Sequence, residues 1–217
     1  AALLWAPVFH GLQTANVTLL LLLGFAASWR YRESLRGVAV ASGLTIAAKI
    51  ICWPLLLWLA ATRRLQRAAA ALAVALAVTF GLWATLGFSG LLDYPSSMER
   101  LSNEVSPGSY TVKALAVDLG LGSTVGGALM AAVALGALGA CVVLGRKGDD
   151  RLSFAFCVLA AIVASPIVWL HSFALLLAPL ALARPCFSRV WLLPAVLWLA
   201  SGTGNGAFIR SQNGGDQ

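Results

Sequence analysis

Charged residues are scarce in this sequence, and so are long polar stretches. Only 11% of the 217 residues are charged and 60% are hydrophobic, whereas about a quarter of the residues of a typical soluble protein are charged. Six apolar runs follow one another with short connections: 17–29, 38–62, 68–88, 125–144, 152–183 and 190–201. Their lengths approach the roughly 20 residues that a helix needs to cross a bilayer. The composition excludes an ordinary soluble protein and predicts an all-α fold, a polytopic transmembrane helix bundle.

Residues that bind metals or form disulfides are also few. Three of the four cysteines lie within apolar runs and Cys186 lies in a basic connection, so we expect four free thiols. His10 and His171 are the only histidines, and they show no spacing typical of a metal site. The glycine-rich stretches 120–122 and 202–206 have no strand before them, which excludes a dinucleotide fingerprint. We therefore predict no metal and no cofactor.

The basic residues give the chain a net charge of +7, yet their distribution does not indicate nucleic-acid binding. They cluster in short connections next to apolar runs. Cytoplasmic loops of membrane proteins carry such an excess of Lys and Arg. We therefore predict no nucleic-acid partner, and we expect membrane lipids to surround the chain.

Two apolar segments are basic at both ends and are too long or too interrupted for one plain span. The segment 38–62 lies between arginines and contains Lys49 and Pro54. The segment 152–183 would be about 50 Å long as a single helix, at about 1.5 Å per residue. If each segment is a hairpin of two short helices, both of its basic ends return to the cytoplasmic side. We therefore predict two short helical hairpins within the bundle.

The positions of the basic residues support these hairpins. With both hairpins, eleven of the fifteen basic residues lie on the cytoplasmic side. If the segment 38–62 is a single span, eight basic residues lie outside and six inside, which contradicts the positive-inside bias. The cytoplasmic set consists of Arg30, Arg32, Arg36, Arg63, Arg64, Arg67, Arg146, Lys147, Arg151, Arg184 and Arg189.

The hairpin topology places the polar segment 89–124 outside the membrane, where a loop of this length is unusual and often functional. We treat residues 1–209 as one transmembrane domain that includes this outer loop, and residues 210–217 as a disordered tail. The chain begins with Ala1 and enters apolar sequence without a basic leader. We therefore expect a fragment or a processed piece that lacks N-terminal helices and a first outer loop.

Lys49 is the one basic residue deep within an apolar run. A charge at such a depth is costly unless it faces a cavity or a partner. At a hairpin turn, a lysine and the free backbone groups of broken helices can hold an anion such as a phosphate. The alternative is a lysine whose long side chain reaches the membrane interface. We prefer the phosphate interpretation.

Polar residues also mark the second hairpin. His171 lies five residues after Pro166, and a histidine there can hold a phosphate oxygen, move a proton or fill a polar corner. Trp169 is either an interfacial anchor or a platform on which a sugar stacks. Near the first run, Asn16 and Thr18 form a glycosylation sequon, which we interpret instead as a polar cluster at a helix N-terminus.

Two stretches resemble signature sequences of glycosyltransferase family 87: AKIICWPLLLW at 48–58 and SPIVWLH at 165–171. The similarity extends from about Gln13 to about Gly206. Members of this family are polytopic C-type glycosyltransferases that use polyprenyl-phosphate sugars, typically of mannose, to extend envelope glycolipids on the outer side of the membrane. The resemblance implies a hexosyltransferase of the plasma membrane, with a polyprenyl-phosphate sugar as donor and a glycolipid or glycan as acceptor.

The resemblance also implies which residues form the site. His171 is implied as a catalytic residue and Lys49 as a ligand of the donor phosphate, with Ser165 and Trp169 as neighbours. Asn16 is implied in substrate binding, although the stretch 15–18 reads ANVT where the family often has GQVN. The catalytic aspartate of the family lies in a first outer loop, upstream of the part that matches. We therefore expect this chain alone to be inactive.

Two other classes of function are compatible with parts of the pattern. A transporter or lipid flippase also uses broken helices and a membrane lysine, but it should show an internal repeat, and only the basic flanks of the hairpins repeat. A non-catalytic membrane subunit would explain the missing acidic loop but not the two polar hairpin tips. The sequence therefore favours the glycosyltransferase.

Overall fold

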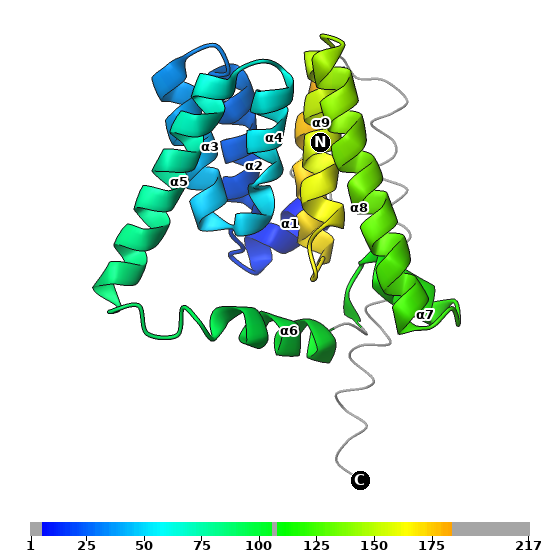
Figure 1. Ribbon diagram of the computed structural model, residues 1–217. Helices are drawn as coiled ribbons and strands as arrows, with labels where there is room; N and C mark the ends of the chain where they lie inside the picture. The colour runs from blue at the N-terminus through cyan, green and yellow to red at the C-terminus, as the bar shows by residue number, and fades with distance from the viewer. Residues whose placement is uncertain (1–5, 106–107, 184–217) are drawn as a thin grey trace.

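The computed structural model describes residues 6–105 and 108–183, and this part of the chain contains helices and no strands (Figure 1). The predicted all-α class is therefore confirmed. The helices are α1 (Ala6–Gln13), α2 (Thr18–Arg30), α3 (Leu35–Ala48), η2 (Ile50–Cys52), α4 (Pro54–Ala61), α5 (Leu65–Thr85), α6 (Tyr94–Val105), α7 (Val112–Asp118), α8 (Ser123–Arg146), α9 (Asp150–Val163), η4 (Leu170–Leu176) and α10 (Leu177–Ala183). The apolar run 190–201, Cys186 and the tail 210–217 lie outside the described residues.

The segment 38–62 forms the predicted hairpin. Helix α3 ends where Lys49 adopts an extended backbone conformation (φ −155°, ψ 112°), and the 3-10 helix η2 then turns the chain. Pro54 opens α4, because a proline in the first turn of a helix loses no hydrogen bond. After α4, the guanidinium of Arg64 donates a hydrogen bond to Glu33, which precedes α3. Both ends of the hairpin therefore lie on one side of the molecule.

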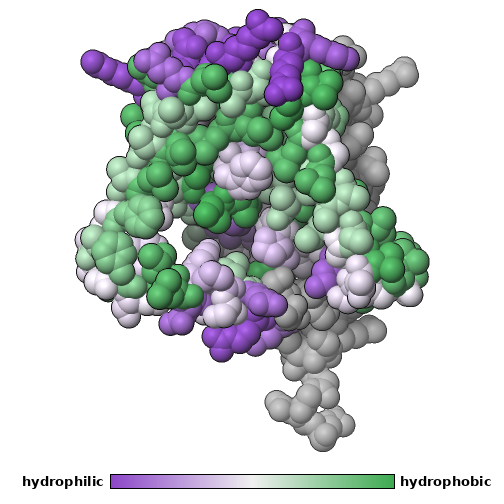
Figure 2. Space-filling model, viewed as in Figure 1, coloured by the Kyte–Doolittle hydropathy of each residue, from purple (hydrophilic) through white to green (hydrophobic). Residues whose placement is uncertain are grey.

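An ion-pair network joins the two hairpins at this side. The carboxylate of Asp150, the first residue of α9, accepts two hydrogen bonds from Arg64 (3.2 and 3.0 Å) and one from Nε of Arg32 (3.1 Å). It also accepts a hydrogen bond from the indole N–H of Trp58 (2.8 Å). Figure 2 shows that hydrophilic side chains gather on this end of the molecule. We call Arg32, Glu33, Arg64, Arg67 and Asp150 the arginine-rich end.

The segment 152–183 also turns back, but its returning limb differs from the prediction. Helix α9 ends at Val163, and an irregular stretch that contains Ser165 and Pro166 follows. The chain then returns as the 3-10 helix η4 and the short helix α10, which packs against α9 and α2. Arg184, which was expected to mark the cytoplasmic end of this limb, lies outside the described residues.

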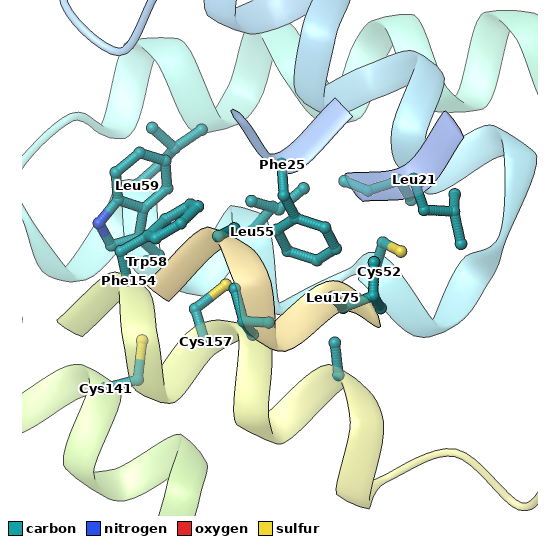
Figure 3. Close-up of a cluster of buried hydrophobic side chains, with 14 of the residues drawn as sticks. Leu21, Phe25, Cys52, Leu55, Trp58, Leu59, Cys141, Phe154, Cys157 and Leu175 are labelled. Atoms are coloured by element: carbon teal, nitrogen blue, oxygen red, sulfur yellow. The ribbon is translucent and has the colours of Figure 1, made fainter. Parts of the chain in front are cut away.

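The core lies where the two hairpins meet α2 (Figure 3). Phe25, Trp58 and Phe154 are fully buried, and the rings of Phe25 and Trp58 both contact Phe154 edge-on, at 6.1 and 4.8 Å between centroids. Such contacts stabilise a core beyond the burial of apolar surface. Three cysteines are free thiols buried in or beside this cluster, as expected: Cys52, Cys141 and Cys157.

Two long helices flank this core. Helices α5 and α8 are long and apolar enough to cross a membrane, and only 11% of the most apolar window of each is buried. A core helix of a soluble protein would be mostly buried, and a signal sequence would lie near the N-terminus. The exposed apolar surface of α5 and α8 therefore indicates that the chain associates with a membrane.

The polar segment 89–124 contains two helices, α6 and α7, which the sequence analysis treated only as a loop. Helix α7 packs against α8, whereas α6 lies across the molecule at the end opposite the arginine-rich end (Figure 1). The segment therefore connects the end of α5 to the start of α8, and both of these lie away from the arginine-rich end.

Candidate functional site

The two hairpins reach less far from the arginine-rich end than the two long helices do. Helices α3 and α9 have 14 residues each, which is about 21 Å at about 1.5 Å per residue. Helices α5 and α8 have 21 and 24 residues, which is about 32 and 36 Å. All four helices have one end at the arginine-rich end, so the turns of both hairpins lie well short of the far ends of α5 and α8. Figure 2 shows the molecule hollowed between α5 and the central helices.

Lys49 stands at the turn of the first hairpin, between α3 and η2. Its backbone N–H still donates to the carbonyl of Thr45 (3.2 Å), but its extended conformation ends the helix. The side chain is half-buried, and within the described part of the chain no carboxylate pairs with its ammonium group. A half-buried cation without an acidic partner favours the approach of an anion from outside the chain.

His171 lies in η4 and is buried, with 5% of its surface exposed. Its Nδ1 is 3.4 Å from Nδ1 of His10 in α1, and the two rings are stacked with 5.6 Å between centroids and 10° between planes. A neutral imidazole has one N–H and one acceptor nitrogen, so one ring donates and the other accepts. Lys49 belongs to the same region, because η2, which follows Lys49, and η4, which contains His171, both pack against α9. We call Lys49, His10 and His171 the basic corner.

Ser165 and Trp169 shape the turn of the second hairpin next to His171. The hydroxyl of Ser165 is buried and donates to the carbonyl of Ile167 (2.6 Å), which stabilises the irregular stretch after α9. Trp169 is half-buried and immediately precedes η4. Its backbone N–H donates to the hydroxyl of Ser172 (3.3 Å), and its carbonyl accepts from the N–H of the same residue (2.9 Å). Both residues therefore hold the backbone that positions His171.

Asn16 lies at the start of α2. Its carboxamide oxygen accepts hydrogen bonds from the N–H (3.0 Å) and the hydroxyl (2.7 Å) of Thr18, so the interpretation as a polar cluster at a helix N-terminus is confirmed. The backbone N–H of Asn16 donates to the carbonyl of Gly11 (2.9 Å). A Cβ atom at Gly11 would lie 3.6 Å from the Cβ atom of His171. Asn16 thus contacts Gly11, which in turn lies next to His171 of the basic corner.

The polar segment 89–124 contacts the second hairpin directly. The backbone N–H of Tyr110 donates to the carbonyl of Val168 (2.7 Å), and the hydroxyl of Ser109 accepts from the N–H of Val168 (3.0 Å). The ring of Tyr110 meets that of Phe173 edge-on at 6.0 Å between centroids. The segment that precedes α7 is therefore fixed to the stretch that holds Trp169.

The main residue that sequence reasoning missed at this site is His10. The sequence gave no reason to pair it with His171, because 161 positions separate the two and neither lies in a spaced motif. The composition did offer one signal. The chain has two histidines and few other polar residues, and buried polar groups need hydrogen-bond partners, so the two histidines were candidates to pair with each other. Within the described residues, no group of three or more His, Cys, Asp or Glu side chains could hold a metal ion.

Comparison with known proteins identifies the family of the chain. The model of glycosyltransferase family 87 matches residues 1–172, which include His10, Lys49 and His171. The match begins before Gln13, where we expected the similarity to begin, and it stops at Ser172, whereas we expected it to continue to about Gly206. No curated protein and no solved structure matches the chain. Because the match covers most of the sequence, the chain belongs to glycosyltransferase family 87 and is a membrane glycosyltransferase.

Proposed function

We propose that the protein is a mannosyltransferase and that this chain holds the phosphate of a polyprenyl-phosphate mannose donor. The acceptor is a glycolipid or glycan of the cell envelope, and transfer takes place at the outer side of the plasma membrane. The observation that supports this proposal is the basic corner, which combines a half-buried lysine at a broken helix with a pair of histidines. Among the described residues, no carboxylate pairs with this lysine. A donor phosphate would provide the anion that this corner lacks.

The place of the corner suits a donor that is itself a lipid. The hairpin turns lie short of the far ends of α5 and α8, which corresponds to a depth inside the outer half of a bilayer about 30 Å thick. A polyprenyl chain stays among the lipid tails, and its phosphate reaches the corner without crossing the membrane. A water-soluble nucleotide sugar would have to bring a strongly hydrated diphosphate to the same depth, which is costly.

The reaction forms one bond and breaks another. An acceptor hydroxyl oxygen attacks the anomeric carbon, the bond from this carbon to the phosphate oxygen breaks, and polyprenyl phosphate leaves with the electron pair. The hydroxyl proton passes to a base, which the family resemblance implies is an aspartate of the family's first outer loop. Attack from the side opposite the phosphate inverts the configuration of the sugar.

Lys49 and His171 act on the leaving phosphate. Negative charge grows on its oxygens as the bond breaks, and donors already placed in a site of low polarity lower the barrier to this step. When His10 donates to Nδ1 of His171, the other ring nitrogen of His171 carries a proton and can donate to a phosphate oxygen. His10 is thus a positioning residue, and Ser165 and Trp169 hold the stretch that presents His171.

The donor class can be tested in membranes from cells that express the complete gene. Labelled mannose is supplied either on polyprenyl phosphate or on a nucleotide, and labelled glycolipid is measured against membranes of the deletion strain. We expect transfer from the polyprenyl donor and none from the nucleotide when polyprenyl phosphate is absent. Transfer from the nucleotide alone would refute the donor class. The absence of gene-dependent transfer from a panel of polyprenyl-phosphate sugars would favour the non-catalytic subunit.

A further inference from the structure

Helix α6 has one apolar and one polar side. Tyr94, Met98 and Leu101 follow the helical spacing of four and three residues, which places them on one face. Glu99 and Arg100 lie on the other side of the helix. A helix of this pattern buries its apolar face in whatever covers it.

Other described helices leave most of this apolar face uncovered, although Met98 is half-buried. No other described helix packs along α6, and the side chains of Tyr94 and Leu101 are 47% and 45% exposed. The connection from α5 to α6 continues the apolar surface, with Leu86 65% and Leu92 93% exposed. An apolar strip of this extent is unusual on a surface that faces water.

The ends of the long helices place α6 at the level of a bilayer surface. Helix α5 ends at Thr85 and α8 begins at Ser123, and both are candidate membrane spans. Helix α6 lies between these two ends and runs across them rather than along them (Figure 1). The covalent connection to two spans therefore holds α6 against the headgroup region, whatever its intrinsic affinity for lipid.

We propose that α6 lies in the bilayer interface, with Tyr94, Met98 and Leu101 among the upper parts of the lipid tails and Glu99 and Arg100 in the headgroup region. Tyrosine suits this level because its ring is apolar and its hydroxyl reaches water. The occupant of the apolar face is thus the surrounding bilayer. The inference rests on the fold and the two spans, and it does not depend on the identity of the sugar donor.

The charges of α6 indicate what kind of bilayer contact this is. Its charged residues are Glu99 and Arg100 on the polar side and Glu104 at the border of the two sides, so carboxylates outnumber the guanidinium group. Most interfacial helices add attraction between lysines or arginines and anionic lipids to the burial of apolar surface. Helix α6 lacks this attraction, and its contact should therefore be equally close in zwitterionic and in anionic vesicles.

Two substitutions on opposite faces of α6 form a matched test. Ser96 and Met98 are two positions apart, which is about 200° around the helix, and both change to cysteine without a change in charge. Each variant is made in the full chain with Cys186→Ala, labelled with a small fluorophore and reconstituted into phosphatidylcholine vesicles. The three buried native thiols are controlled for by labelling the chain without either new cysteine.

Quenching then reports what each face contacts. We expect lipids with a nitroxide near the top of the acyl chain to quench the label of Met98→Cys at least about threefold more than that of Ser96→Cys, and aqueous iodide to show the reverse order. Equal quenching of the two labels by iodide, with no effect of the lipids, would overturn the proposal. A label at position 98 that neither quencher reaches would overturn it as well, because a protein surface would then cover the face. Leu101→Cys repeats the test if the Met98 variant inserts poorly.

Discussion

Replacement of Asp150 by alanine should destabilise the fold more than any other single change at the arginine-rich end. The carboxylate of Asp150 joins the hairpins, because it accepts hydrogen bonds from Arg64 and Trp58 of the first hairpin and lies on the first turn of the second. A carboxylate at the start of a helix also interacts favourably with the helix dipole. Its loss leaves the guanidinium of Arg64, whose side chain is only 14% exposed, with Glu33 as the one carboxylate partner that remains among the described residues.

The size of the effect follows from this geometry. Removal of one partner from a fully buried ion pair costs about 3–5 kcal/mol. The side chain of Asp150 is 24% exposed and Arg64 keeps one partner, so we take about 2 kcal/mol for the ion pairs. The lost hydrogen bond of the Trp58 indole adds about 1 kcal/mol. The free energy of unfolding should therefore fall by about 3 kcal/mol.

Equilibrium unfolding in mixed micelles measures this free energy, and Asp149→Ala is the matched control. Asp149 is the adjacent residue, carries the same charge and caps α9 by accepting from the N–H of Leu152 (3.0 Å). Its replacement removes the cap alone and should cost about 1 kcal/mol. If the two variants lose the same amount, the ion-pair network does not join the hairpins and our reasoning fails.

Three further predictions concern packing, pH and the basic corner. Gly43→Ala should destabilise the chain by about 1–3 kcal/mol in the same assay, because the new Cβ would lie 2.6 Å from a side chain of α5. The control Gly139→Ala places its Cβ where nothing lies within 4 Å, so it should be neutral or stabilising. Equal effects of the two variants would contradict the close approach of α3 and α5. The hydrogen bond from Arg64 lowers the pKa of Glu33 from its usual value of 4.5. The contribution of the Glu33 carboxylate to stability is therefore complete above pH 4.5 and is lost as the pH falls through the lowered pKa. Glu33→Gln should abolish this part of the acid sensitivity, and an unchanged pH profile would refute the assignment. His10→Ala should raise the KM for the lipid donor about fivefold, which equals about 1 kcal/mol, and in His10→Gln the KM should return part of the way to the wild-type value. Identical kinetics of both variants and the wild type would exclude a positioning role.

The hairpins could be predicted because the positions of basic residues along the sequence indicate the membrane topology. Arginines next to apolar runs mark the side on which each run ends, and Lys49 and Pro54 mark where the first run is interrupted. The 3-10 conformation of the returning limb of the second hairpin could not be predicted, because its apolar residues fit an α-helix and a 3-10 helix equally well.

Other features depend on contacts that no local pattern encodes. The two histidines of the basic corner, and Asp150 and its arginine partners, come together only when distant segments pack. Helix α6 was missed for a different reason. Its low hydropathy indicated a loop, although the spacing of Tyr94, Met98 and Leu101 was already helical. Whether Lys49, His171, Ser165, Trp169 and Asn16 bind substrate stays a prediction.

The most direct test of the donor-phosphate site compares the lysine at the turn of the first hairpin with a lysine beside the arginine-rich end. Lys49→Met and Lys147→Met remove the same charge, but Lys147 is exposed beside the arginine-rich end. Each variant is expressed from the complete gene, matched for membrane insertion and assayed for transfer of labelled mannose from polyprenyl phosphate. We expect Lys49→Met to lower the rate by about 100-fold and Lys147→Met to leave it unchanged. A Lys49→Met enzyme that transfers mannose at the wild-type rate would contradict the assignment of the basic corner to the donor phosphate.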